Sequence, residues 1–117
     1  MLKLIIAGGR DFNDYELLLR EMSTLPKPDF IVCGMAKGAD LLGFKYAKEN
    51  KIPILEYKPD WDNLGKSAGY IRNKEMAKNA SHLLAFWDGK SKGTKHMIDT
   101  AKNEKLLVRV CRYGAGT

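Results

Sequence analysis

Cysteine and histidine are scarce in this chain of 117 residues, which contains only Cys33, Cys111, His82 and His96. Cysteines this far apart form neither a CxxC pair nor a disulfide framework, and the histidines have no neighbour at metal-ligand spacing. We therefore expect two small, buried, unpaired cysteines, no metal and no cofactor. Thiols kept out of disulfides are typical of a cytoplasmic protein.

Long apolar runs and blocks of like charge are also missing. No stretch of about eighteen apolar residues occurs, so we expect no membrane partner. Lysine and arginine nevertheless outnumber acidic residues by 20 to 14, and the net charge of +6 favours an anionic partner such as a nucleotide or a nucleic-acid backbone. The length fits a single domain, expected at residues 1–113, with a flexible tail at 114–117.

Two familiar phosphate-binding fingerprints are absent as well. The segment GKS at 89–91 resembles the end of a P-loop, but that motif needs a glycine five residues before Gly89, where Leu84 stands. The first apolar run is followed by Gly8 and Gly9 alone rather than by G-x-G-x-x-G, so an NAD-type dinucleotide site is unsupported.

In place of these fingerprints, the sequence alternates short apolar runs with amphipathic stretches. The expected strands are residues 2–7, 29–34, 52–57, 82–87 and 105–112, and the expected helices are residues 13–22, 38–50, 68–80 and 94–104. This alternation predicts an α/β protein, a Rossmann-like three-layer α/β/α sandwich with helices on both faces of a parallel sheet. Right-handed crossovers order its five strands 3-2-1-4-5.

Three local features complete this expected fold. Asn13 caps the first helix, with Glu16 three residues on as in a capping box. Residues 58–69 are irregular. The second helix has a broad apolar side, made of Leu41, Leu42, Phe44 and Tyr46.

Three glycine-bearing loops follow expected strands, at residues 8–12 (GGRDF), 34–40 (GMAKGAD) and 88–94 (DGKSKGT). Strands 1, 2 and 4 are neighbours, so the loops meet at the rim where α/β sheets bind ligands. Glycine allows close backbone approach, and the N-terminus of a following helix attracts phosphate. A tight turn explains any one loop equally well, but three together predict a phosphate-bearing ligand. The loop residues expected to bind it are Gly8, Gly9, Arg10, Asp11, Phe12, Gly34, Lys37, Gly38, Ala39, Asp40, Asp88, Ser91, Gly93 and Thr94.

Arg72 and Asn73 are two further candidates, near the start of the third expected helix and at the end that faces the rim. The planar guanidinium of Arg72 is suited to clamp a phosphate. The competing interpretation is an ion pair with Glu75, three residues on, at the helix surface.

Aromatic and acidic residues supply the remaining candidates. Trp61 could present, with Phe12 and Trp87, a flat apolar surface to a nucleobase. Alternatively Trp61 closes the core from outside, and Trp87 is more simply the end of a core strand. Asp11 and Asp40 would bind ribose hydroxyls or supply a base, unless they serve only as helix caps and turn residues.

Four segments in order carry a resemblance to a known family: GGRDF, GMAKGAD, AGYIRN (68–73) and AFWDGKSKGT (85–94). Together they resemble the SLOG superfamily, the Rossmann-like group that includes DprA-like and LOG-type proteins, and within it the small YspA-like branch. The resemblance extends from about residue 2 to residue 101. It implies a nucleotide or nucleotide-derived ligand at the rim, ADP-ribose-like in phage–bacteria conflict systems, and a homo-oligomer.

The resemblance also bears on catalysis. LOG-type enzymes cleave nucleoside monophosphates with an arginine on the third helix and the pattern G-G-x-G-T-x-x-E after the fourth strand. Arg72 matches the arginine, and Gly93 and Thr94 match the G-T, but Met97 stands at the glutamate position. Cleavage develops positive charge on the sugar, which a carboxylate stabilises and methionine cannot. The sequence therefore leans away from an enzyme and toward a sensor or sequestering protein.

Two alternatives stay open. A hydrolase of an N-glycosidic or phosphoester bond would use the carboxylates of Asp11, Asp40 or Asp88. A DNA binder of DprA-like type would use the positive net charge, although the chain has no basic block and a phosphate rim suits one small anion better than a long backbone.

Overall fold

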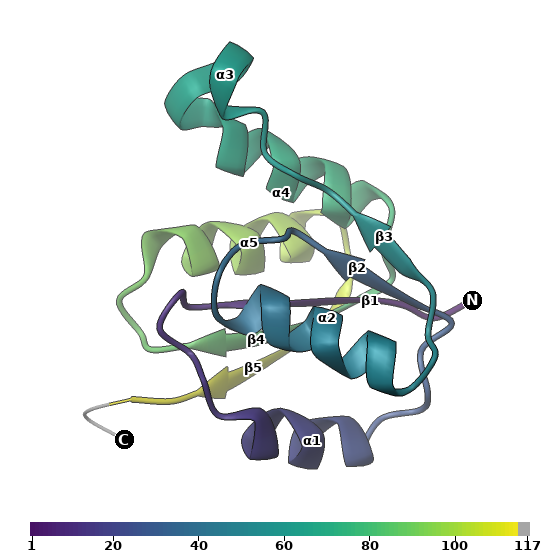
Figure 1. Cartoon of the computed structure of the whole chain (residues 1–117). Coiled ribbons are helices and arrows are strands. Elements are labelled where there is room, and N and C mark those ends of the chain that lie inside the picture. Colours follow the sequence, from purple (N-terminus) through teal and green to yellow (C-terminus); the bar gives the residue numbers. More distant parts are fainter. Residues whose placement is uncertain (115–117) are drawn as a thin grey trace.

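A computed structural model of the protein describes residues 1–114, in which helices cover both faces of a central sheet (Figure 1). The strands are β1 (Lys3–Gly8), β2 (Phe30–Cys33), β3 (Ile54–Glu56), β4 (His82–Trp87) and β5 (Leu107–Arg112). The helices are α1 (Tyr15–Ser23), α2 (Ala39–Glu49), α3 (Trp61–Leu64), α4 (Ala68–Lys78) and α5 (Lys92–Asn103), with a 3-10 turn at Gly65–Ser67. All strands are parallel, in the order β3-β2-β1-β4-β5, which confirms the predicted α/β sandwich.

Alternate residues of the inner strands pack into two separate apolar cores. On β1, Leu4 and Ile6 pack on the face covered by α1 and α2. Ile5 and Ala7 pack on the opposite face, against α4 and α5. All four side chains are buried, and burying one large aliphatic side chain stabilises a fold by about 1.5–3 kcal/mol. Burial on both faces explains why the inner strands read as continuous apolar runs rather than as alternating ones.

The start of α1 differs from the prediction. Asp14, not Asn13, is the N-cap, and its side chain accepts a hydrogen bond of 3.0 Å from the N–H of Leu17. The helix begins at Tyr15, so Glu16 lies in the first turn and does not close a capping box with Asn13. Aspartate and asparagine cap helices about equally well, and the chain uses the one nearer to the apolar positions of α1.

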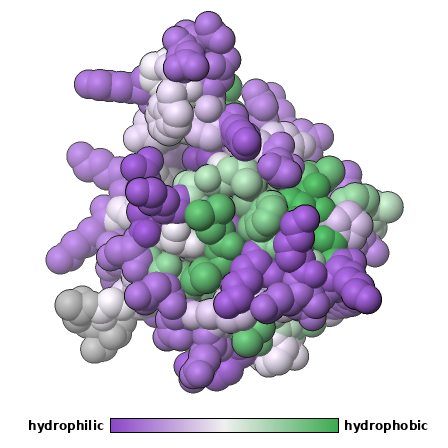
Figure 2. All heavy atoms as spheres, in the orientation of Figure 1, coloured by the Kyte–Doolittle hydropathy of each residue, from purple (hydrophilic) through white to green (hydrophobic). Residues whose placement is uncertain are grey.

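The packing face of α2 agrees with the prediction only in part. Its buried residues are the small or polar Ala39, Asp40, Gly43 and Ala47, whereas Leu41 is 43% exposed. The helix lies so close to β1 that a Cβ atom on Gly43 would approach the Cβ of Ile6 to 2.8 Å. Leu42 and Tyr46 pack at the margin of the core as partly buried side chains, whereas Leu41 lies on the outer face. Figure 2 shows apolar side chains gathered over α2 and toward β3.

Residues 58–69 are more ordered than predicted. Asp60 caps the short helix α3, and the 3-10 turn follows it directly. Neither element buries a side chain, so the apolar pattern gave no signal for them. Figure 1 shows α3 projecting beyond the start of α4, away from the sheet.

Both cysteines are unpaired, as predicted, but only Cys33 is buried. Cys111 is half-buried because β5 is an edge strand. The predicted tail at 114–117 falls, apart from Gly114, outside the described residues. Within residues 1–114, no helix is long and apolar enough to cross a bilayer.

Replacing Gly43 by alanine tests the close approach of α2 to β1. The added methyl group would collide with Ile6, so we expect Gly43→Ala to lower the free energy of unfolding by about 1–3 kcal/mol. Gly93 in α5 is the matched control, because no atom lies within 4 Å of its added Cβ. Gly93→Ala should be neutral or stabilising by up to about 1 kcal/mol, from helix propensity alone. Urea denaturation measures both values, and equal stabilities would contradict the close packing.

Candidate functional site

The carboxyl-terminal rim of the sheet holds a cavity of about 530 Å³, bounded by the loops after β1, β2 and β4 and by α3, α4 and α5. The predicted site residues that line it are Gly8, Gly9, Arg10, Asp11, Asp40, Trp61, Arg72, Asn73, Asp88, Ser91, Gly93 and Thr94. Lining residues outside the predicted set are Ala7, Ala36, Lys66, Gly69, Tyr70, Met76 and Met97. The topology therefore brings the three loops to one place, while their part in binding a ligand stays a prediction.

The other five predicted residues do not line the cavity: Phe12, Gly34, Lys37, Gly38 and Ala39. Phe12 is the clear correction, because its ring is buried and stacks on Phe86 with the centroids 4.3 Å apart. Gly38 and Ala39 join the loops to each other. Gly38 has a φ of +81°, and the N–H of Ala39 donates to the carbonyl of Gly9. Lys37 is exposed to solvent.

Arg72 is fixed on one side and open on the other. Its Nη1 donates to the carbonyl of Gly34, and its Nε donates to Oδ1 of Asn73 over 3.1 Å. Asn73 is buried and bonds on through Nδ2 to Nδ1 of His96, 3.1 Å away. Among the described residues, Nη2 has no hydrogen-bond partner and Arg72 forms no ion pair with Glu75. The guanidinium is therefore preorganised, with one edge free for a ligand.

Asp40 lies beside Arg72 and is only 5% exposed. Its Oδ2 accepts a hydrogen bond of 3.3 Å from the N–H of Ala36. Burial raises the pKa of this carboxyl to about 6, while the charge of Arg72, the Ala36 N–H and the charge of Arg10 act against that rise. A carboxyl group that titrates near neutral pH thus stands in the cavity wall.

The loop between β4 and α5 is less open to phosphate than its glycines suggest. Oδ1 of Asp88 accepts hydrogen bonds of 2.8 Å from the N–H groups of both Lys90 and Ser91, which hold the pKa of Asp88 below its usual value. The Ser91 hydroxyl accepts from the Thr94 N–H and lies 3.0 Å from the Thr94 hydroxyl. Within residues 1–114, the N–H groups left without a protein acceptor at this helix start belong to Lys92 and Gly93. The carboxylate of Asp88 thus occupies much of the loop that was predicted to bind phosphate.

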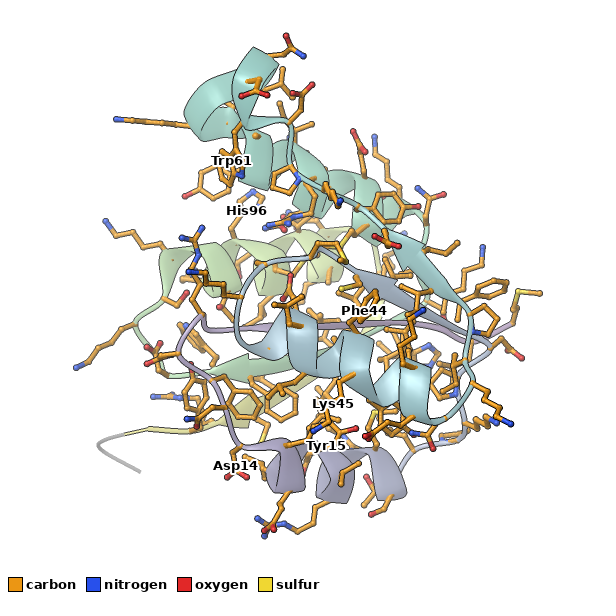
Figure 3. All side chains as sticks on the ribbon, in the orientation of Figure 1. Asp14, Tyr15, Phe44, Lys45, Trp61 and His96 are labelled. Carbon is orange, nitrogen blue, oxygen red and sulfur yellow. The ribbon has the colours of Figure 1, made fainter. Side chains whose placement is uncertain are left out.

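Two half-exposed aromatic rings form the outer part of the cavity. Trp61 is 50% exposed and Tyr70 is 47% exposed, and both line the cavity. The Tyr70 ring packs on the imidazole of His96, with the centroids 4.2 Å apart. Figure 3 shows Trp61 on the side of α3 that faces α5, where His96 lies. Sequence reasoning passed over Tyr70, although it lies two residues before Arg72 in the segment AGYIRN.

Trp87 is not part of this aromatic wall. Its indole N–H donates to the carbonyl of Ser91 over 3.1 Å, and its ring packs against the core shared by α4 and α5. The interpretation of Trp87 as the end of a core strand is therefore confirmed, and its ring is not part of the cavity lining.

Met97 lines the cavity from the first turns of α5 and is buried. A thioether therefore stands where the LOG-type pattern has its glutamate. The charged side chains around the cavity are three cations and three carboxylates: Arg10, Lys66, Arg72, Asp11, Asp40 and Asp88. No group of three histidine, cysteine or acidic side chains within residues 1–114 could hold a metal ion.

Fold and site define an α/β protein with a ligand-sized cavity at the carboxyl rim of its sheet. Residues 2–63 match the family described as YspA, cpYpsA-related SLOG family. The chain is also 33% identical over 125 aligned positions to the Gene 61 protein of Mycobacterium phage D29, an alignment that covers 97% of this chain and 98% of that protein. The chain therefore belongs to the YspA, cpYpsA-related SLOG family. No solved structure matches it.

The buried carboxyl of Asp40 gives a prediction for stability against pH. Its pKa is about 6 in the fold against an ordinary value of 3.8, so between these pH values the folded state holds a proton that the unfolded state has released. Stability must then fall as pH rises from about 4 to about 6, by about 3 kcal/mol for this group, and stay level above. In Asp40→Asn this contribution disappears. Urea denaturation between pH 4 and 8 measures the difference, and parallel curves for the two proteins would contradict the assignment.

Proposed function

We propose that the cavity binds a nucleotide or nucleotide-derived small molecule of ADP-ribose type, and that the protein senses or sequesters this ligand. One observation carries the proposal: the free guanidinium edge of Arg72 and the half-exposed rings of Trp61 and Tyr70 line the same cavity. The guanidinium can bind a phosphate, and the aromatic rings can stack on a nucleobase. Cavities of this volume are typical of small-molecule sites.

A ribose would be held by Asp11 on the loop after β1. Tyr113 donates to its Oδ1 over 2.6 Å, and burial together with this bond raises the pKa of Tyr113, so the phenol stays a donor at neutral pH. The carboxylate is thereby oriented, and Oδ2 is left to accept a hydroxyl hydrogen. Ribose hydroxyls are the donors that such an acceptor suits.

Met97 favours a protein that binds the ligand over an enzyme that cleaves it. A thioether neither donates a proton nor stabilises positive charge on a sugar. The relative encoded by a mycobacteriophage supports a place for this protein in conflict between phages and bacteria, where a sequestered nucleotide signal would be the point of contact.

Thermal stabilisation by ADP-ribose tests the binding proposal. A ligand present at about a hundred times its Kd adds roughly 2.7 kcal/mol to the free energy of unfolding, which raises the melting temperature. Arg72→Ala should lose charge-assisted bonds of about 1.5–3 kcal/mol, a roughly 10- to 150-fold weaker Kd. Arg109→Ala is the matched control, because Arg109 lies outside the cavity and bonds to Thr24. Equal affinities of the two variants would contradict a ligand at Arg72.

Tryptophan fluorescence tests the aromatic wall. The chain has two tryptophans, so in Trp87→Phe the emission comes from Trp61 alone. We expect ADP-ribose to change this emission because the base stacks on the ring, and Trp61→Ala to weaken binding by about 1–3 kcal/mol. Ribose 5-phosphate, which lacks a base, is the matched ligand. If both ligands leave the emission of Trp61 unchanged while they bind, the base lies elsewhere.

Hydrolysis of the same ligand is the second candidate function, and Asp40 is the observation that favours it. A cavity carboxyl with a pKa of about 6 can exchange protons with a bound ligand at neutral pH. Chromatography of the protein incubated with nucleoside monophosphates and ADP-ribose separates the two functions. Free base or ribose phosphate would favour the hydrolase, and recovery of intact ligand would favour the binding protein.

A further inference from the structure

Asp40 and Arg72 lie on either side of Gly34 without touching. Oδ2 of Asp40 and Nη1 of Arg72 lie 2.7 and 2.8 Å from the point that a Cβ on Gly34 would occupy. Both residues line the cavity, and the described residues include no ion pair between them. The two opposite charges are therefore neighbours across a glycine, and each still faces the space that a ligand would enter.

Few groups compensate the charge of Asp40. Arg72 faces it from α4, Arg10 from the loop after β1, the N–H of Ala36 from the loop after β2, and the backbone of Gly8 from the end of β1. The buried thiol of Cys33 on β2 also lies close, and burial raises the pKa of this thiol to about 11, so it adds no charge at neutral pH. The other charged residues that line the cavity are one cation, Lys66, and two carboxylates, Asp11 and Asp88. Asp40 therefore depends mainly on Arg72.

A bound anion would take part of that compensation away. A phosphate at Nη2 of Arg72 would bring negative charge and exclude water beside a carboxylate that is already buried. Two such anions in a medium of low dielectric repel strongly unless one of them takes up a proton. We propose that Asp40 takes up a proton from solvent when an anionic group of the ligand binds Arg72, so that ligand affinity falls as pH rises. This inference rests on the proposed function.

The protonation balances simply. The carboxylate of Asp40 and one solvent proton become a carboxylic acid, with no bond in the ligand made or broken. Because burial already raises the pKa of Asp40 to about 6, the proton is taken up at small cost near neutral pH. A neutral ligand adds no charge at Arg72 and should bind with no such proton. Asp40 thus sets how strongly the cavity prefers an anion at each pH.

His96 is the other titratable group connected to Arg72, through Asn73. Burial and the nearby Lys74 ammonium lower the pKa of His96, so it is already neutral near pH 7. It does not line the cavity. His96→Gln keeps an acceptor for the Asn73 amide and removes the titration, which makes it the matched control for Asp40→Asn.

Isothermal titration calorimetry with ADP-ribose tests the inference. The pyrophosphate of ADP-ribose has no group that titrates near neutral pH, so a dependence of the binding heat on buffer ionisation counts protons taken up by the protein. We expect uptake approaching one proton between pH 7 and 8, and an affinity that falls up to about tenfold per pH unit above pH 6. His96→Gln should take up as many protons as the wild type, even if the lost ring contact with Tyr70 changes the affinity. Asp40→Asn should take up no proton and bind more tightly than the wild type at pH 8.

Adenosine is the matched ligand, because it has the base and ribose but no phosphate, and its affinity should not change with pH. Binding of ADP-ribose by the wild type with no proton uptake overturns the inference and leaves the proposed function standing. Uptake that persists in Asp40→Asn, with the fold verified by circular dichroism, also overturns it. Failure of both ligands to bind at any pH overturns the proposed function, and the inference with it. The wild-type proton count needs no variant, so a poorly folded Asp40→Asn does not prevent the decision.

Discussion

The bond from the Arg72 guanidinium to the carbonyl of Gly34 is the contact on which the rest of the site depends. It connects α4 to the end of β2 across the rim, so the helix that bears Tyr70 is positioned by the same group that would meet a phosphate. A side chain at position 34 would have to displace the ends of the Arg72 and Asp40 side chains, because both come within 3 Å of the place where its Cβ would lie. Any larger residue at position 34 would push the guanidinium away from the sheet. The fold and the candidate site are thus joined through one backbone carbonyl.

The rim loops satisfy much of their own backbone. Asp88 accepts two N–H groups before α5, and Asp40 accepts one before the first turn of α2. Carboxylates in these places do what a bound anion would do at an open helix start. Recognition of an anion is therefore left mainly to side chains, above all Arg72. This arrangement suits a composite ligand, in which a phosphate, a sugar and a base each meet a different group, better than it suits a lone phosphate.

The sequence predicted well the features that follow from a repeating apolar pattern. It predicted poorly the orientation and hydrogen bonds of single side chains in the loops. The apolar strands and the glycines after them predicted the sheet order and the convergence of three loops, since both follow from burial and from right-handed crossovers. Phe12 was misplaced because an aromatic residue after a strand can turn up to the rim or down onto Phe86, and spacing does not choose between them. Tyr70 escaped notice because half-exposed aromatics look like ordinary helix surface. The internal bonds of Asp88 depend on loop dihedrals that no pattern encodes.

Met97 changes the chemistry of the cavity through charge as well as through reactivity. The cavity balances three cations against three carboxylates, and a glutamate at position 97 would add a fourth negative charge to the same enclosed space. Two carboxyl groups that share a cavity push their pKa values apart, and this separation creates an acid and a base. With methionine there, Asp40 has no second buried carboxyl to work against, because Asp88 is held ionised by two N–H bonds and Asp11 is exposed. A single carboxyl that can be protonated responds to the charge of a bound ligand. Acid–base catalysis would need a second such group, to accept a proton from the ligand while the first donates one.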